Sequence, residues 1–184
     1  MAGDEVFGLV PFDPDGAAAE YVVVPSSSVA RMPLDVPDVV AAAAALPALT
    51  AWEALSEHAQ LQPGQRILIR GGTGGVGSFL TQFARDEGAD VTVTAPARTV
   101  AHAMALGAQR VIEAGTESTQ ADLGQFDVGI DAVGADTPEW LFALVWPGGR
   151  VITCRNRRTL HWPPSTGSWP SSSSSRPVAR SSTS

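Results

Sequence analysis

The pattern Gly-x-Gly-x-x-Gly, at Gly72 to Gly77, constrains the fold of this chain more than any other feature. A short apolar strand is predicted directly before it, at residues 66–70, and a helix directly after it, because apolar residues recur there at helical spacing. Gly88 ends that helix, and a β-branched strand follows at 91–94. Strand, glycine turn, helix and strand in this order predict a βαβ unit.

Each glycine of the pattern has a physical role in a Rossmann-type βαβ unit. The first permits the tight turn after the strand, the second lets the backbone approach a pyrophosphate, and the third lets helix and strand pack closely. Gly72, Gly74 and Gly77 occupy these three places. The pyrophosphate would lie over the N terminus of the helix that begins near Val76, where free N–H groups and the helix dipole favour an anion. The predicted cofactor-binding residues of the loop are Gly72, Thr73, Gly74, Gly75, Val76 and Gly77.

The alternative for this loop is a glycine-rich turn that merely allows compact packing. A single Gly-x-Gly-x-x-Gly is a weak signal when it stands alone. Here a strand, a helix and a second strand flank it in the expected order. The dinucleotide site is therefore the favoured interpretation.

The end of the second strand predicts which dinucleotide is bound. NAD is recognised by an Asp or Glu about 20 residues after the loop, which accepts a hydrogen bond from the ribose 2′-hydroxyl. No acid stands at residues 94–98, so a 2′-phosphate would meet no repulsion there and could pair with Arg98. The sequence therefore predicts NADP(H), with Thr94 and Arg98 at the site. The alternative for Arg98 is a solvated residue at a helix start.

Strand and helix patterns continue to alternate along the chain. A second helix is predicted at 99–106, closed by Gly107, and further strands at 110–112, 127–130 and 150–153. Alternating β and α elements predict an α/β fold with a parallel sheet, here of five strands.

Two other units are predicted before the glycine loop. Strands at 6–12 and 17–24, joined by a turn at 13–16, predict a hairpin, which must pack on something else to be stable. Two helices are predicted after it, at 38–46 and 49–60, before a Pro-Gly pair breaks the pattern.

The charge of the chain argues against nucleic acid as a partner. The net charge is −7, and every Asp and Glu lies at or before Glu139, so the part that carries the motifs is strongly acidic. Small molecules are the predicted partners. No apolar run approaches a membrane span, and no secretory signal opens the chain. The single cysteine, Cys154, excludes an internal disulfide and a cysteine zinc cluster, and it fits a reducing cytoplasm.

The composition changes abruptly after Thr153. Residues 154–184 hold five arginines, ten serines and no acid, together with several prolines. Such a segment buries too little apolar surface to fold, so disorder is predicted. The alternative is a frameshift, because the chain lacks lysine and GC-rich genes give this composition out of frame. Translating the other frames of the source DNA would test it.

Several further motifs occur in the order found in one family. Residues 3–8 and 19–25 resemble strands of a GroES-like barrel, and 49–52 resemble the segment beside the nicotinamide. Residues 131–134 and 147–151 resemble later parts of a nucleotide-binding domain. From Gly3 to Thr153 the chain resembles the medium-chain dehydrogenase/reductase superfamily and, within it, the zinc-independent quinone oxidoreductases.

The resemblance implies a division of the chain. Residues 1–35 would be a remnant of a GroES-like catalytic barrel, 36–153 a Rossmann NADP(H)-binding domain without its last strand, and 154–184 a disordered or aberrant tail. By the same analogy, Thr50 lies close to the nicotinamide and Val133 lines the cofactor site. The alternative for Thr50 is a local cap at a helix start.

The resemblance also implies an activity, the transfer of a hydride between NADP(H) and a quinone, an enone or a similar carbonyl compound. No residue is assigned as catalytic, because packing explains the lone Tyr21 better than acid catalysis does. No metal ligands are predicted, and His58 and His102 are expected on helices as solvated or core-edge residues. Ala114 stands where relatives often carry a tyrosine near the 2′-phosphate, which reduces the preference for NADP(H).

Two departures from the family bear on activity. Relatives have additional residues before the stretch that resembles 3–8, and these form most of the catalytic domain. After Thr153 they continue with a further strand. An NADP(H)-dependent oxidoreductase, or a truncated form of one, is the favoured interpretation. A non-catalytic NADP(H)-binding module and an inactive gene fragment are the alternatives. Because relatives commonly dimerise through the strand that is missing here, a homodimer is expected to be weakened or absent.

Overall fold

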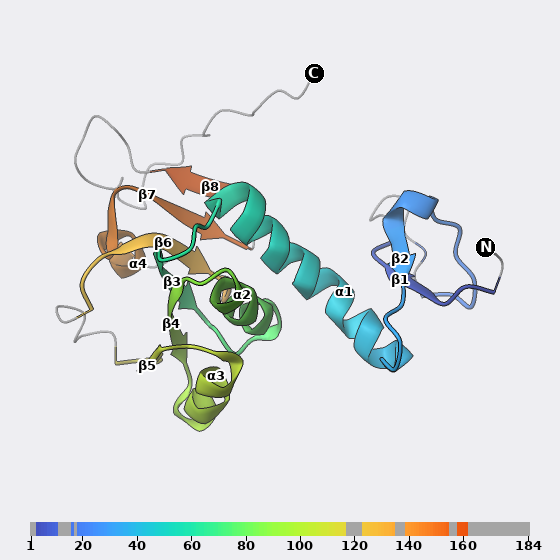
Figure 1. Cartoon of the computed structure of the whole chain (residues 1–184), viewed down its shortest axis with the longest axis horizontal. Coiled ribbons are helices and arrows are strands. Elements are labelled where there is room, and N and C mark those ends of the chain that lie inside the picture. The colour runs from blue at the N-terminus through green and yellow to red at the C-terminus, as the bar shows by residue number, and fades with distance from the viewer. Residues whose placement is uncertain are drawn as a thin grey trace, which may run out of the picture.

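A long helix joins a six-stranded sheet, with helices on both of its faces, to a small two-stranded sheet (Figure 1). The order of strands in the large sheet is β5-β4-β3-β6-β7-β8. The residues that the computed structural model describes are 3–10, 16, 18–116, 123–134, 139–154 and 158–161, the last four by their backbone alone.

Five consecutive strands of the large sheet run parallel. The central residues of β3, β4 and β6 are buried and mostly β-branched or aliphatic, as expected where helices cover both faces of a parallel sheet. The prediction of a Rossmann-type α/β fold with five parallel strands is confirmed. These strands are β3 (Arg66–Arg70), β4 (Asp90–Ala95), β5 (Arg110–Glu113), β6 (Phe126–Asp131) and β7 (Val145–Thr153).

A sixth strand corrects the expectation for the C-terminal part of the chain. β8 (Arg158–His161) pairs with β7 in the antiparallel direction. It lies within 154–184, where disorder was predicted, and it covers the edge that was expected to stay open. The free backbone groups of an edge strand pair with any extended segment nearby, so poor apolar content does not prevent this contact. Residues 155–157 and 162–184 lie outside the described part of the chain.

The helix between the two sheets is continuous, which corrects the prediction of two helices. α1 (Asp38–Glu53) runs through Pro47 and passes into a π-helical turn, η2 (Ala54–Ala59). Proline normally breaks a helix by removing an N–H donor, but the alanines at 41–45 and the leucines around it favour helix strongly. The stretch Asp38–Ala59 is also long and apolar enough to cross a membrane by length and composition, contrary to expectation; core helices of soluble proteins pass the same test.

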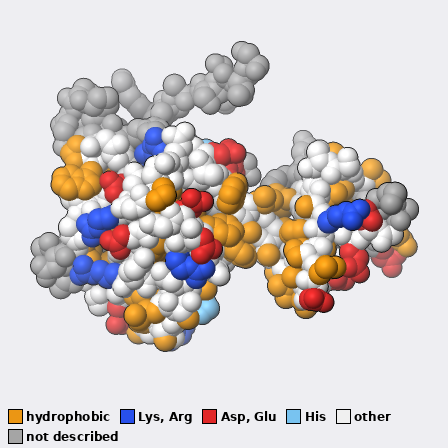
Figure 2. All heavy atoms as spheres, in the orientation of Figure 1, with side chains coloured by type: hydrophobic (Ala, Val, Ile, Leu, Met, Phe, Trp, Pro, Cys, Tyr) orange, Lys and Arg blue, Asp and Glu red, His pale blue; other side chains and the backbone are white. Residues whose placement is uncertain are grey.

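Only one side of α1 is covered in this structure. Trp52 lies edge-on to Phe83 of the neighbouring helix, with ring centroids 6.1 Å apart. Val39, Leu46 and Leu49 are at least 45% exposed. Figure 2 accordingly shows apolar atoms along the helix that joins the two sheets.

The small sheet differs from the predicted hairpin. β1 (Val6–Gly8) pairs antiparallel with β2 (Val29–Arg31), which follows a 3-10 turn, η1 (Ser26–Ser28). The described residues from 18 to 25 form no strand, and Val23 is fully exposed, so the predicted second strand was wrong. A β-branched run needs a partner strand, and this one has none in the described part of the chain. The turn predicted at 13–16 lies outside the described residues except for Gly16, and the relation to a GroES-like barrel stays a prediction.

Two layers of side chains form the core, one on each face of the large sheet. The first joins α1, α2 and α3 to the sheet, and the second lies under α4, a helix that was not predicted. The predicted helix at 99–106 is α3 preceded by a 3-10 turn. The remaining helices are α2 (Gly75–Asp86), η3 (Ala97–Thr99), α3 (Val100–Leu106) and α4 (Glu139–Ala143).

Candidate functional site

The strand order creates a single switch point at the carboxyl edge of the sheet. From β3 the chain adds β4 and β5 on one side, and it then returns to add β6 and β7 on the other. The loops after β3 and β6 therefore diverge to opposite sides. In open α/β sheets, ligands bind in the crevice that forms at this place.

The glycine loop after β3 is built by close backbone packing. Gly71 has φ +84°, which only glycine adopts without strain, so it makes the tight turn that was assigned to Gly72. Gly72 is needed for another reason, since an added Cβ would lie 2.5 Å from the Cβ of Val93 on β4. Gly77 serves the packing role that was predicted, because an added Cβ would overlap the carbonyl group of Gly71.

Two other glycines of the loop are exposed to solvent. Gly74 and Gly75 are exposed, and a Cβ added to Gly75 would meet no atom within 4 Å. Gly74 is the N-cap of α2, which carries no acid in its first turn and no capping side chain. The free N–H groups of this turn and the dipole of α2 favour an anion at this point. The backbone between Gly74 and Val76 could thus hold a pyrophosphate.

Four threonines fix the conformation of this loop. The Thr94 hydroxyl accepts a hydrogen bond from the Gly71 N–H at 3.0 Å, so Thr94 holds the turn, and its contact with a cofactor stays a prediction. The Thr81 hydroxyl on α2, which no sequence pattern indicates, shares its single proton between the carbonyls of Gly72 and Gly77, at 3.0 and 2.8 Å. The hydroxyls of Thr73 and Thr99 lie 3.1 Å apart. This last contact joins the glycine loop to the segment after β4.

Arg98 lies in that same segment. It belongs to η3, is exposed, and makes no ion pair or hydrogen bond with any described residue. Because Thr99 touches Thr73, the Arg98 backbone lies beside the glycine loop. An unengaged guanidinium at this edge suits a phosphate group.

Among the described residues, no hydrogen bond joins Thr50 to the glycine loop. It lies inside α1, not at a helix start, and its hydroxyl donates to the Leu46 carbonyl at 2.9 Å. The alternative of a helix cap is therefore wrong, and a contact with nicotinamide stays a prediction.

Val133, in contrast, lies directly against the turn. An added Cβ on Gly71 would be 2.7 Å from Cγ2 of Val133, and the Val133 side chain is 58% exposed. Its N–H donates to Oδ1 of Asp131 at 3.1 Å. Val133 thus contacts the Gly71 turn at the switch point, before the two loops diverge, and presents an apolar side chain there.

Cys154, just after β7, belongs to the same edge. Its N–H donates to the Asp131 carbonyl at 3.0 Å. Burial, and secondly the charge of Asp131, raise the pKa of the Cys154 thiol from its ordinary value of 9.0 to about 11. The thiol is therefore neutral and unreactive near pH 7.

We expect iodoacetamide to alkylate folded Cys154 about tenfold more slowly than the unfolded chain, because the thiolate fraction falls while each thiolate becomes more nucleophilic.

The raised pKa of Cys154 also affects the stability of the fold. The contribution of the neutral thiol is fully present below pH 9.0 and is lost as the pH rises towards 11, because the unfolded chain then ionises first. Urea unfolding of the wild type and of Cys154→Ser on both sides of this window measures the difference. Equal pH dependence, or equal alkylation rates, would contradict the assigned environment.

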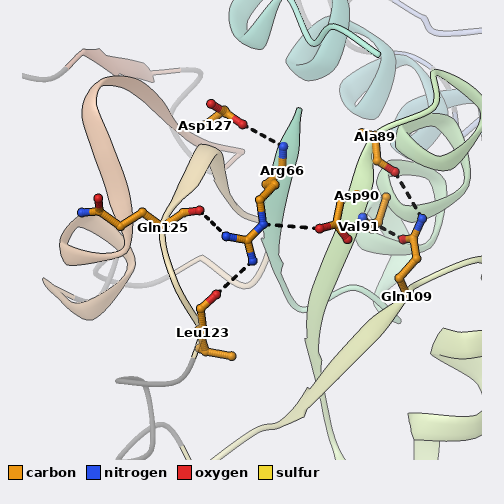
Figure 3. A network of polar contacts seen from close by, with 8 residues as sticks. All are labelled: Arg66, Ala89, Asp90, Val91, Gln109, Leu123, Gln125 and Asp127. Atoms are coloured by element: carbon orange, nitrogen blue, oxygen red, sulfur yellow. Dashed lines mark hydrogen bonds and ion pairs between the residues drawn. The ribbon is translucent and has the colours of Figure 1, made fainter. Parts of the chain in front are cut away.

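The polar groups at the opposite, amino edge of the sheet have a structural role. The Arg66 guanidinium donates to the carbonyls of Gln125 and Leu123 at 2.6 and 2.9 Å and pairs with Asp90 at 3.3 Å (Figure 3). Asp127 accepts a hydrogen bond from the Arg66 N–H at 2.8 Å. These hydrogen bonds all join one part of the protein to another.

A pocket of about 480 Å³ also lies at the amino edge. Its walls include Gln60, Asp127, Trp146 and Arg150, but no residue of the glycine loop. Arg150 donates to the Ala59 carbonyl and to the Gln60 side chain, so two of its N–H groups already bind the protein. This pocket is therefore separate from the crevice at the carboxyl edge.

No group of three or more potential metal ligands is found within the described part of the chain. His58 lies 3.9 Å from Glu53 on the same helical stretch and is partly exposed. His102 lies on α3 and is exposed, so both histidines lie on helical segments with at least part of the side chain in solvent, as expected.

The family model and the similar proteins found by comparison agree with one another. The family model described as zinc-binding dehydrogenase matches residues 75–156. The mitochondrial NAD(P)H oxidoreductase RTN4IP1 of Danio rerio is 34% identical over 160 residues, which cover 82% of this chain and 41% of the relative. This chain therefore spans less than half the length of that relative.

Solved structures agree. An alcohol dehydrogenase superfamily protein from Novosphingobium aromaticivorans is 33% identical with a TM-score of 0.74. The match covers 82% of this chain and 48% of the other. The quinone oxidoreductase from Thermus thermophilus, studied also in its complex with NADPH, is 30% identical with a TM-score of 0.71. That match covers 83% of this chain and 50% of the other.

Proposed function

Because the chain belongs, over part of its length, to the medium-chain dehydrogenase/reductase superfamily, in its zinc-independent quinone oxidoreductase-like group, we propose that it binds NADP(H) as the coenzyme part of an oxidoreductase. The exposed Gly74–Gly75 backbone at the N terminus of α2 carries this proposal. It lies at the switch point of the sheet, with open space above Gly75.

The residues present fit a 2′-phosphorylated dinucleotide. The first turn of α2 offers N–H donors to the pyrophosphate, and Arg98 offers a guanidinium to the 2′-phosphate. Residues 94–98 contain no acid that would repel that phosphate. Val133 provides an apolar surface for the nicotinamide half. The place of Thr50 beside this half rests on the family resemblance alone.

The proposed reaction is reduction of a quinone, an enone or a similar carbonyl compound. Bound NADPH supplies the hydride, and the protein supplies position and electrostatics. In the chain's own residues, the glycine turn and α2 orient the coenzyme. No described residue is assigned to protonate the substrate oxygen, so catalytic residues are left open.

The first test is a titration with NADPH and NADH, followed by tryptophan fluorescence, on the wild type and on Arg98→Ala. We expect the variant to bind NADPH about tenfold more weakly and NADH unchanged, because one charge-assisted hydrogen bond to phosphate is lost at an exposed position. Arg31→Ala is the control, since Arg31 is an exposed arginine in the small sheet. Equal affinities of the wild type for both nucleotides would contradict the choice of NADP(H).

A second measurement separates an enzyme from a binding module. Oxidation of NADPH on addition of a quinone supports the oxidoreductase. Tight binding without oxidation supports the non-catalytic module, and no binding of either nucleotide supports the inactive fragment. The cytoplasmic location and the weak or absent homodimer stay predictions. Because the relative RTN4IP1 is named as mitochondrial, the location of this protein in the cell should be measured as well.

A further inference from the structure

A partly buried ion pair joins the carboxyl ends of the two strands at the switch point. Nη1 of Arg70, the last residue of β3, lies 3.2 Å from both carboxylate oxygens of Asp131, the last residue of β6. The Asp131 side chain is 1% exposed and that of Arg70 23% exposed. These are charged groups at the ends of two strands whose centres are wholly apolar.

The Asp131 carboxylate also fixes the segment that follows it. Its Oδ1 accepts a hydrogen bond from the Val133 N–H at 3.1 Å. The N–H of Ala132, between them, donates to the Arg70 carbonyl at 3.0 Å. Both members of the pair therefore hold residues 132 and 133, one through its side chain and the other through its backbone.

The consequence of this anchoring is the position of the Val133 side chain. It packs against the Gly71 turn while more than half of it stays exposed at the crevice. An apolar side chain held in that way offers a fixed apolar contact to an aromatic ring. Loss of the Asp131 acceptor removes the hydrogen bond that holds the Val133 N–H, while the Ala132 N–H keeps its bond to the Arg70 carbonyl.

Stability alone does not account for the pair. Taking two charges out of water costs free energy, and replacement of such a pair by apolar residues of similar volume is often neutral or stabilising. Asp127, at the other end of β6, shows that a less buried carboxylate suffices to hold the neighbouring strand through an N–H group. The Arg70–Asp131 pair, which costs more free energy of desolvation, is thus found at the carboxyl edge, where the coenzyme is proposed to bind.

We propose that Arg70 and Asp131 are positioning residues, which hold Val133 as the surface for the nicotinamide half of NADP(H). This inference rests on the proposed function. It predicts that the pair contributes to recognition of the nicotinamide half and not of the adenosine half, which lies towards β4 and Arg98.

The test compares NADPH with 2′,5′-ADP, which contains the 2′-phosphate and the adenosine but lacks the nicotinamide half. In the double variant Arg70→Met/Asp131→Leu both charges are gone, so no buried charge is left unpaired. We expect this variant to bind NADPH about tenfold more weakly and 2′,5′-ADP within about twofold of the wild type, because one anchoring hydrogen bond is lost. Asp131→Asn keeps an oxygen for the Val133 N–H and should retain most of the NADPH affinity.

Asp127→Leu is the matched control, because it removes a carboxylate from the same strand at the far edge. It should leave the affinities for both ligands unchanged, whatever its effect on the unfolding temperature. Equal weakening of both ligands by the double variant would show a merely structural role and overturn the inference, as would unchanged NADPH affinity. Failure of the wild type to bind NADPH or 2′,5′-ADP is a different result, which contradicts the proposed function itself.

Discussion

Gly77→Ala is expected to lower the free energy of unfolding by about 3 kcal/mol and to abolish NADPH binding. The added methyl group would overlap the Gly71 carbonyl, and that backbone is held by Thr94 and by the turn itself, so α2 must move away from β3. Such a shift displaces the N–H groups that would face the pyrophosphate. Thermal unfolding followed by circular dichroism, and titration with NADPH, measure the two effects.

Gly75→Ala is the matched control two residues earlier. Its Cβ would meet open space in the first turn of α2, so the stability should change by no more than about 0.5 kcal/mol. NADPH binding should nevertheless weaken, because the new methyl group stands where the pyrophosphate approaches. Wild-type stability of Gly77→Ala would contradict the close packing of helix and strand. Wild-type NADPH affinity of Gly75→Ala would contradict the position of the pyrophosphate.

The part of the fold that is predictable from the sequence is the part with local periodic signals. The strands β3 to β7 and the helices α2 and α3 show their period or their bounding glycines within a few residues. The partner of β1 could not be identified in this way, because pairing is decided between segments far apart. The short strand 29–31 lacks a strong pattern, whereas the exposed run at 21–24 has one.

The sequence predicted where the candidate site lies, but not which residues hold the glycine loop in its conformation. The glycine pattern located the loop, but only the backbone angles show that Gly71 makes the turn. Thr81 looked like an ordinary helix residue, and its two acceptors became evident once the loop was folded over it. Arg70 and Asp131 did leave a signal, since each is a charged residue at the end of an apolar strand that precedes a predicted loop.

The second large effect is expected at the other edge of the sheet. Phe126→Ala should lower the free energy of unfolding by about 4 kcal/mol, because the ring is fully buried and the cavity would remain. The Arg66 guanidinium lies 4.7 Å from the ring centroid, and a cation–π contact of a partly exposed arginine adds no more than about 1 kcal/mol of this. Arg66 keeps its bonds to Leu123 and Gln125 in the variant, so the loop before β6 should stay attached (Figure 3).

Coenzyme affinity separates this effect from those at the glycine loop. At temperatures where Phe126→Ala is still folded, NADPH should bind as to the wild type, because Phe126 begins β6 at the amino edge while the crevice lies at its carboxyl end. Trp146→Ala, which removes a half-exposed aromatic residue from the neighbouring strand, should change stability by no more than about 0.5 kcal/mol. Weaker NADPH binding by folded Phe126→Ala would mean that the two edges are coupled through β6. The division into a structural amino edge and a functional carboxyl edge would then be wrong.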